Sequence, residues 1–231
     1  MIRERNILSD LFNKESEEFR TETLLKILKE RDPLTHEHSV EVATFSAKLA
    51  EYAGYSEQEV KEIEKGAMLH DIGKLIEIYT FVHESRKPTD EEWRRIKKHP
   101  RFGADILKFQ RLPERYIRIA LLHHRKFNGE GYPDVTNDEM PEGRIPHDVG
   151  IVTVGDNLSA MFRGDRGELR SPVRIDKEIK EEFEAGKFDP NLEKPYIEFS
   201  KDPFIQSFMQ KKYEANLKRK REVDNVSRRS L

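Results

Sequence analysis

The sequence predicts an all-α protein, because helical spacing of apolar residues and helix-capping signals recur along most of its 231 residues. No stretch keeps the alternating pattern of a β-strand, and no internal repeat is present. A chain of this length buries a substantial hydrophobic core. We therefore expect one large helical domain with short segments appended at both ends.

The first three predicted helices are each delimited by recognisable residues. Pro33 and Gly54 end the first two, since proline cannot continue a helix and glycine favours the left-handed position that terminates one. Ser56 and Glu59 form a capping box at the start of the third. These helices are expected over residues 15–32, 35–54 and 56–73.

The middle of the chain continues the helical pattern and then breaks it. Thr89 and Glu92 form a second capping box, and Pro113 suits a helix start. Residues 125–145 hold three glycines and two prolines, so they predict a long loop, and long loops inside compact domains are usually functional. The four helices expected on either side of this loop cover 89–100, 102–110, 113–124 and 145–164.

The remainder of the chain gives weaker signals. The segment 164–202 is charged and irregular, with one helix expected near 176–185. After it, a C-terminal helix is expected to fray into a basic tail, which we interpret as a solvated helix end rather than a phosphate-binding arm. The expected units are an N-terminal extension (1–19), a catalytic domain (20–200), and the C-terminal helix with its tail (201–231).

Composition narrows the functional classes. The net charge is −2 with 37% charged residues, so no overall field points to specific nucleic-acid binding. The chain has no cysteine, which excludes disulfides and thiolate metal sites and favours a cytoplasmic location. Neither an apolar signal segment nor a run of roughly 20 apolar residues is present, so no membrane span is expected. Any bound metal must therefore use histidine, aspartate or glutamate.

Seven potential metal ligands stand on five separate predicted helices. A single histidine on an apolar helix is more often a hydrogen-bonded core residue than a ligand, but their joint occurrence favours one shared site. Because a carboxylate has two oxygens, Asp71 could bridge two ions, and two ions roughly 3.5–4 Å apart can clamp a phosphodiester around an activated hydroxide. Lys74 lies one turn after His70 and could stabilise phosphate oxygens, although a helix-terminal lysine is the simpler interpretation. The candidate ligands are His38, His70, Asp71, His99, His123, His124 and Asp156.

The order of these residues resembles that of the HD superfamily of metal-dependent phosphohydrolases. The succession HDIGK, KPTDEEWRRIKKHP, HHRKFNGEGYP, RIP and VGD is similar to one branch of it, the HD-GYP domain. HDxGK alone would indicate only the superfamily, whereas a His-His pair closely followed by GxGYP is far more specific. The resemblance covers about residues 20–165.

This resemblance implies an all-helical HD-domain bundle with a long GYP loop and a metal centre that hydrolyses cyclic di-GMP to linear pGpG or GMP. It implies that Asp71 bridges two divalent ions, usually iron or manganese, with nickel, zinc or cobalt also compatible with such ligands. Lys74 would assist at the phosphate, and Gly131, Tyr132 and Pro133 would form the GYP loop. In the family this loop is associated with substrate access and with domains that synthesise cyclic di-GMP, so a diguanylate cyclase or an adaptor protein is an expected partner.

Several departures from the family pattern bear on the substrate. Leu34 stands where some members carry a glutamate for a third metal, so two metals are predicted. IEIY (76–79) replaces the usual GIPD, the loop before RIP is longer, and Ser159 stands where many members have a second aspartate. Arg163 or Arg166 would take the place of the family's substrate-binding arginine, next to Lys74 and Tyr132 as substrate contacts. The metal site thus resembles the family more closely than the substrate contacts do.

The alternatives to a cyclic di-GMP phosphodiesterase retain the metal centre but change its substrate or its role. One is an HD-type phosphohydrolase that acts on another cyclic dinucleotide, a nucleotide or a phosphomonoester, motivated by the altered substrate segments. A second is a non-catalytic signalling adaptor whose metals are structural. A mixed-valent di-iron oxygenase is the most remote.

Overall fold

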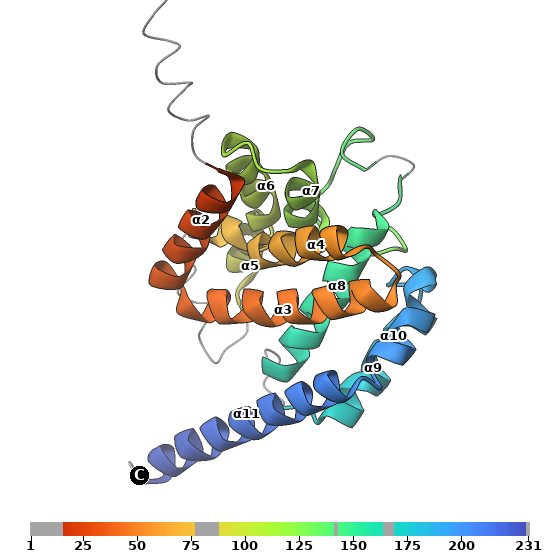
Figure 1. The fold of residues 1–231 in the computed structure, drawn as a ribbon. Helices are drawn as coiled ribbons and strands as arrows, with labels where there is room; N and C mark the ends of the chain where they lie inside the picture. Colours follow the sequence, from red (N-terminus) through yellow and green to blue (C-terminus); the bar gives the residue numbers. More distant parts are fainter. Residues whose placement is uncertain (1–15, 77–87, 141–142, 164–168, 230–231) are drawn as a thin grey trace, which may run out of the picture.

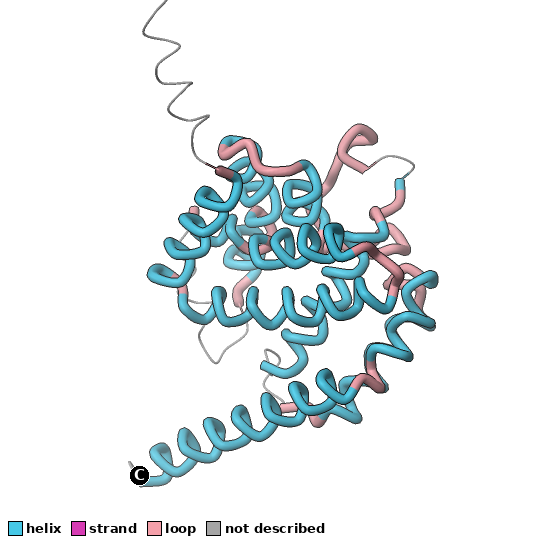
Figure 2. Tube along the Cα trace, viewed as in Figure 1, coloured by secondary structure: helices cyan, strands magenta, loops and turns pink. Residues whose placement is uncertain are grey.

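A computed structural model describes residues 16–76, 88–140, 143–163 and 169–229 of the chain, with side chains described up to Arg221. The described residues are mostly helical and contain no β-strand, which confirms the predicted all-α class (Figures 1 and 2). The elements, in chain order, are α2 (Glu17–Arg31), α3 (Pro33–Tyr52), α4 (Glu57–Leu69), η1 (Ile72–Leu75), α5 (Asp90–Ile96), α6 (His99–Phe109), α7 (Glu114–Leu122), α8 (His147–Arg163), α9 (Pro172–Glu184), η4 (Pro190–Leu192), α10 (Glu193–Phe199) and α11 (Pro203–Arg229).

Local sequence signals fix most helix ends where they were predicted. Both capping boxes form, at Ser56 and at Thr89, with side chain and backbone hydrogen bonds in each direction. Pro33 separates α2 from α3 by opening the second helix, where its missing N–H is not needed. Gly54 follows α3 at φ +84°, a conformation that favours glycine.

The long helix α3 is the centre of the bundle. It packs against α4 and α8 over much of its length and is also contacted by α2 and α10. Its buried face carries Val42, Phe45 and Leu49, which join the main hydrophobic core with apolar residues of α4, α7 and α8. A second, smaller core around Leu28 and Tyr116 joins α2 to α6 and α7. Burial of these two cores is the main force that holds the five ligand-bearing elements together.

The bounds predicted for two helices around the second capping box, at Thr89, were wrong. The helix that begins after Thr89 ends at Ile96, before Pro100, and a new helix begins at His99. Pro100 is therefore in the first turn of α6, where a proline is well tolerated. Trp93 on α5 is 43% exposed, although a tryptophan on a predicted helix is expected to anchor the core.

The C-terminal third is more ordered than its charge pattern indicated. The segment predicted as irregular contains α9, which begins at Pro172, and also η4 and α10, which the sequence analysis missed. Phe183, Tyr196 and Phe199 from this region are buried in the main core. The first turns of α11 add Ile205 and Met209 to that core, and the C-terminal part of the helix points away from the bundle (Figure 1). No helix in the described ranges is long and apolar enough to cross a membrane.

Candidate metal centre

The seven predicted ligands converge on one buried place from five different elements. His38 comes from α3, the adjacent His70 and Asp71 from the junction of α4 and η1, and Asp156 from the middle of α8. His99 is the first residue of α6, and the pair His123 and His124 follows the last turn of α7. All seven are buried except His124, which is partly exposed. Their roles as ligands stay predictions, but their proximity is an observed feature of the fold.

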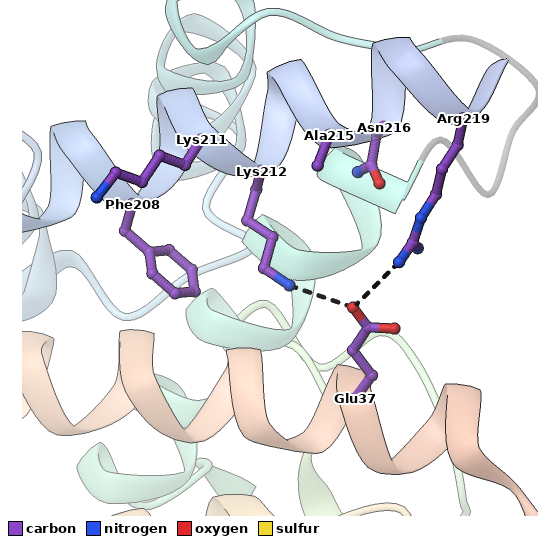
Figure 3. Close-up of a pocket in the computed structure, with 7 residues that line it drawn as sticks. All are labelled: Glu37, Phe208, Lys211, Lys212, Ala215, Asn216 and Arg219. Carbon is purple, nitrogen blue, oxygen red and sulfur yellow. Dashed lines mark hydrogen bonds and ion pairs between the residues drawn. The ribbon is translucent and has the colours of Figure 1, made fainter. Parts of the chain in front are cut away.

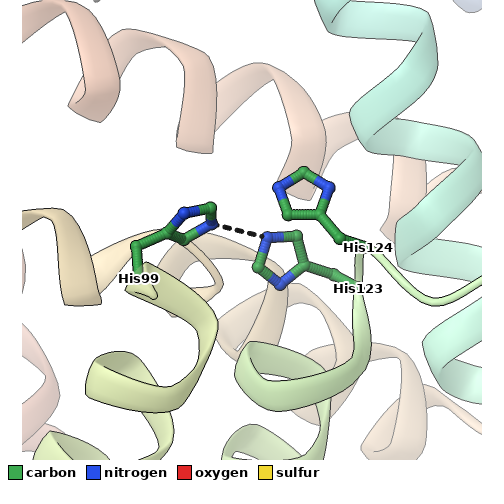
Figure 4. Close-up of side chains that lie close together, drawn as sticks. All are labelled: His99, His123 and His124. Atoms are coloured by element: carbon green, nitrogen blue, oxygen red, sulfur yellow. Dashed lines mark hydrogen bonds between the residues drawn. The ribbon is translucent and has the colours of Figure 1, made fainter. Parts of the chain in front are cut away.

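The donor atoms form two groups that are linked through Asp71. Figure 4 shows His99, His123 and His124, whose donor atoms lie within 4.8 Å of one another. His38, His70 and Asp156 form a second group within the same limit. A third set, of His70, Asp71 and His123, also lies within this limit and joins the two groups. Asp71 Oδ1 lies 3.1 Å from His99 Nε2, while its Oδ2 lies 3.4 Å from His70 Nε2. The two oxygens of one carboxylate therefore face the two groups.

Backbone carbonyls orient three of the imidazoles. In His70, His99 and His123, Nδ1 lies 2.7, 2.6 and 2.9 Å from the carbonyl oxygen three residues earlier. A carbonyl oxygen only accepts hydrogen bonds, so each Nδ1 must carry the proton and donate it. The lone pair is then on Nε2, which faces the cluster. Hydrogen bonds of this kind commonly fix the tautomer of metal-binding histidines.

Burial and neighbouring charges set the protonation states. Burial alone would raise the pKa of Asp71, but Lys74, His70 and His99 hold the pKa of that carboxyl well below its ordinary value. Burial would also raise the pKa of Asp156, but His38 and other histidines beside it outweigh burial, and the pKa of this carboxyl is lowered. These carboxyl groups are therefore anionic at neutral pH.

Burial has the opposite consequence for the imidazoles. It lowers the pKa of His99, and that of His123 more strongly, and it lowers the pKa of His124 to about 3. For His70 burial also lowers the pKa, but the Asp71 carboxylate outweighs it and the net shift is upward. The lowered pKa values keep His99, His123 and His124 neutral, and neutral imidazoles beside anionic carboxylates are what metal binding needs.

Two unpaired atoms indicate that the cluster suits a metal. His70 Nε2 and Asp71 Oδ1 are buried and have no hydrogen-bond partner in the part of the chain that the structure describes. Leaving such an atom unsatisfied costs about 1–3 kcal/mol. Imidazole and carboxylate donors without thiolate are typical of first-row divalent ions. The donor set, its division into two groups and these unpaired atoms together fit a pair of such ions.

Lys74 stands directly beside the shared carboxylate. Its Nζ lies 2.5 Å from Asp71 Oδ2, and its side chain is 17% exposed. The residue sits on η1, so one short helical turn separates it from Asp71 in the chain. The expectation that Lys74 shares a face with the cluster is met, while a direct contact with phosphate stays a prediction.

The first part of the GYP loop folds back onto His124. Arg125 and Gly131 form an isolated β-bridge, and Gly131 has φ +100°. A Cβ atom at Gly131 would lie 2.0 Å from the His124 carbonyl oxygen, so only glycine fits there. The ring of Tyr132 then lies 4.6 Å from that of His124, centroid to centroid. Burial raises the pKa of Tyr132, which therefore stays a neutral phenol.

The remaining predicted contacts are less directly placed. Arg163 Nη1 donates a hydrogen bond to the Leu34 carbonyl at 2.8 Å, which ties the end of α8 to the start of α3. Arg166 and residues 77–79 of the IEIY segment lie outside the described residues. The proposed arginine contact with substrate therefore remains a prediction.

Sequence reasoning missed two residues near the site. Lys97 Nζ lies 5.7 Å from the centroid of the Tyr132 ring, over its face. Thr153 Oγ1 lies 3.1 Å from the backbone carbonyl oxygen of His123 and 3.0 Å from that of Val149, so its single proton is shared between the two and the hydroxyl packs α8 against one of the ligands. The position of Thr153, one helical turn before Asp156, was a signal for the same face of α8.

The fold and the site define an all-α protein with a buried histidine–aspartate centre. The HD domain family model matches residues 35–161, which contain α4, α6 and α7 completely, most of α3 and α8, and all seven candidate ligands. The chain therefore belongs to the HD domain family, as its sequence motifs predicted.

Known proteins with similar sequences are named as phosphodiesterases. A cyclic di-GMP phosphodiesterase of Thermotoga maritima is 32% identical over 206 residues, which cover 83% of this chain and 54% of that protein. The 3'3'-cGAMP-specific phosphodiesterase 2 of Vibrio cholerae is 31% identical over 194 residues, which cover 81% of this chain and 35% of that protein. The chain thus spans about half or less of the length of these relatives.

A solved structure shares the fold. The HD domain of the Listeria monocytogenes phosphodiesterase PgpH, in complex with cyclic di-AMP, superposes with a TM-score of 0.59 at 25% identity. The match covers 77% of this chain and 94% of that domain. The expected helical HD bundle is thereby confirmed.

Proposed function

We propose that this protein is a metal-dependent phosphodiesterase that hydrolyses cyclic dinucleotides, with cyclic di-GMP as its substrate. One observation carries the proposal: two groups of donors share Asp71, and Lys74 stands beside the shared carboxylate. A phosphodiester is an anion whose negative charge increases in the transition state, so it needs cations on its oxygens. A dinuclear site with an adjacent lysine meets that need.

The residues that would hold the two ions follow from the two donor groups. His99, His123 and His124 would bind one ion, the other group would bind the second, and Asp71 would bind both. When bound, such a pair of divalent ions supplies Lewis-acid stabilisation of the phosphate oxygens and activates water. The chain keeps Asp71 anionic and its imidazoles oriented for this task before any ion arrives.

Two side chains of the protein would act on the substrate itself. Lys74 presents its ammonium group beside Asp71 and is still partly exposed, so a phosphate oxygen can reach it. Tyr132 keeps its phenolic proton and can donate it to a substrate oxygen. Neither residue needs to transfer a proton in the reaction, and both would bind and orient the phosphodiester. The domain that performs the reaction is proposed to comprise residues 20–200.

The assignment of cyclic di-GMP rests on the HHRKFNGEGYP motif and on the relative from Thermotoga maritima, which is named for that substrate. The products would be linear pGpG or GMP. A second candidate is another cyclic dinucleotide, since similar proteins are named for 3'3'-cGAMP and cyclic di-AMP. Ser159, in place of the aspartate that many HD-GYP proteins have, supports keeping that second candidate.

The test is a substrate panel with metal-loaded protein. Cyclic di-GMP, 3'3'-cGAMP and cyclic di-AMP are each incubated with the wild-type chain and with Asp71→Asn, and the linear products are quantified. The matched control is Asp105→Asn, an exposed aspartate on α6. We expect cyclic di-GMP to be hydrolysed fastest and only Asp71→Asn to lose activity. Faster hydrolysis of another dinucleotide would establish the second candidate, and no hydrolysis of any would refute the proposal.

A further inference from the structure

His38 is oriented differently from the other histidines of the centre. His70, His99 and His123 each donate Nδ1–H to a backbone carbonyl, whereas His38 Nδ1 lies 2.8 Å from the hydroxyl of Ser159. A backbone carbonyl is fixed in direction by its own helix. The hydroxyl of Ser159 can rotate, so its direction depends on the other residues to which it is hydrogen-bonded. The residues that hold this hydroxyl lead outward from the centre to α11.

We propose that Ser159, Glu41 and Lys212 form a hydrogen-bonded relay that orients His38 and makes the metal affinity of the centre depend on α11. The three are positioning residues, because they act on the centre only through His38. This inference rests on the proposed function in so far as it treats His38 as a ligand. It goes beyond it by assigning a role to residues outside the centre.

The direction of the relay follows from a count of protons. Ser159 Oγ donates to Glu41 Oε2 at 2.7 Å, and a hydroxyl has only one proton to give. Toward His38 the same oxygen can therefore only accept, so His38 Nδ1 must carry the proton and donate it. Nε2 of His38 is then the atom left to bind an ion; in the metal-free protein it forms a hydrogen bond with the Asp156 carboxylate at 2.9 Å and lies 3.8 Å from Asp71. The relay thus places a proton on His38 Nδ1, as backbone carbonyls do in His70, His99 and His123, and directs Nε2 toward the centre.

The buried carboxylate of Glu41 needs a neighbouring cation to balance its charge. Glu41 is only 5% exposed, and an ionised carboxylate in such a position is costly unless it is paired. Lys212 Nζ supplies the pair at 2.6 Å from Glu41 Oε1. Since Glu41 Oε2 is occupied by Ser159, both oxygens of the carboxylate are satisfied, one from α8 and one from α11. Removal of Lys212 would leave Glu41 as a buried charge held by one hydroxyl.

The outer end of the relay is anchored by the docking of α11 on α3 and α8. Figure 3 shows Lys212 reaching from α11 to Glu37, 3.3 Å away on α3, beside a cavity of about 300 Å³. Asn216 Nδ2 donates to the Phe162 carbonyl at 2.9 Å at the end of α8. One turn before Lys212 on α11, Phe208 packs edge-on against Phe45 of the main core, with ring centroids 5.3 Å apart. The position of Lys212 is therefore fixed by three kinds of contact.

The magnitude follows from what second-layer partners do in metal sites. Loss of the partner that orients a histidine ligand typically weakens metal binding by about 10–100-fold. We expect this range for Ser159→Ala, which removes the hydroxyl next to His38. For Lys212→Met, two bonds further out, we expect a smaller loss of about 3–10-fold, because Ser159 and Glu41 remain in place.

The experiment compares relay variants with neighbours of the same chemistry. Ser159→Ala is paired with Ser39→Ala, because Ser39 is also fully buried but has no hydrogen-bond partner among the described residues. Lys212→Met is paired with Lys211→Met, the exposed neighbour on α11. Dissociation constants for Mn²⁺ and Co²⁺ are measured on the full chain by competition with a chelator. In parallel, the protonation of the two His38 ring nitrogens is measured in metal-free protein by long-range ¹H–¹⁵N spectra of samples with ¹⁵N-labelled histidine. The signals of His38 are identified by their absence from the spectrum of His38→Gln.

The expected result is weaker metal binding by Ser159→Ala and Lys212→Met and no change in their controls. In wild-type protein His38 Nδ1 should carry a proton, and in Ser159→Ala Nδ1 should be only partly protonated. Equal affinities for all five proteins, with an unchanged His38 tautomer, would overturn the relay. If the chain bound metal in this pattern but hydrolysed no cyclic dinucleotide, only the proposed function would fail. If it bound no metal, the tautomer of His38 alone would decide.

Discussion

A single methyl group at Gly73 is expected to disable the centre without touching the side chain of any candidate ligand. Gly73 lies on η1, between Asp71 and Lys74, where η1 packs against the start of α6. A Cβ atom built at this position would lie 1.9 Å from the carbonyl oxygen of His99 and 2.5 Å from the amide nitrogen of Gly103. Both atoms belong to the backbone, so no side-chain rotation can relieve the contact.

The size of the effect can be worked out from these distances. Real Cβ contacts do not fall below 3.0 Å, so the gap between η1 and α6 must widen by about 1.1 Å. Because the contacted oxygen is part of His99, the His99 ring moves relative to Asp71 by a similar amount. A displacement of about 1 Å in a catalytic site costs on the order of 100-fold in rate. The overpacked core should also lose about 1–3 kcal/mol of unfolding free energy.

The assay measures metal affinity, turnover and thermal stability of Gly73→Ala beside Gly103→Ala. Gly103 is the matched control, since a Cβ there would meet its nearest neighbour at 3.3 Å and requires a shift of only a few tenths of an ångström. We expect Gly73→Ala to remain folded, to bind metal more weakly and to turn over about 100-fold more slowly. Wild-type metal affinity and turnover in Gly73→Ala would refute the reasoning that the η1–α6 contact sets the geometry of the centre.

Three further outcomes are expected from the same geometry. Lys74→Met should keep its metal but lose about 100-fold in turnover, because a cation is missing beside the phosphate. Lys65→Met serves as the surface control. Unchanged turnover in Lys74→Met would exclude Lys74 from the reaction. Tyr132→Phe should retain the packing on His124 and its metal affinity, whereas Tyr132→Ala should weaken metal binding; equal affinities would show that the ring does not position His124. In metal-free protein, His124 stays neutral when folded, with a pKa of about 3, but takes up a proton below about pH 6.5 when unfolded. The unfolding free energy should therefore fall as pH drops from about 6.5 toward 3, by up to about 1.4 kcal/mol per pH unit for this group. Urea titrations of His124→Asn should show a shallower fall. An identical slope in His124→Asn and wild-type protein would contradict a neutral His124 in the folded protein.

The candidate ligands could be predicted from sequence because residue type alone shows which side chains can bind a metal, and their order along the chain matches a known pattern. His70 and Asp71 are adjacent, so no fold can separate them far, and the paired His123 and His124 are similarly constrained. The capping boxes at Ser56 and Thr89 were readable for the same reason, since each involves residues only three apart.

What could not be predicted depends on contacts between residues distant in the chain. Ser159 was noted only as a departure from the family pattern, because nothing in the sequence places Glu41 or Lys212 beside it. The start of α6 at His99 was missed because the charged residues before it continue a helical pattern across the break. The helix α10 was missed because it is only seven residues long, too short to show a helical pattern. Its burial comes from tertiary contacts: Phe199 packs against Phe45 from α3, and Tyr196 packs against Phe199.

The central claim is that the seven ligands form one dinuclear centre that hydrolyses a cyclic dinucleotide. It is tested most directly by purifying the protein without added metal, measuring the metal bound per chain, and assaying cyclic di-GMP hydrolysis on the same sample. The account predicts two divalent ions per chain and hydrolysis in proportion to metal content, both lost in Asp71→Ala. Hydrolysis that persists in metal-free protein, or two ions that remain bound in Asp71→Ala, would contradict it.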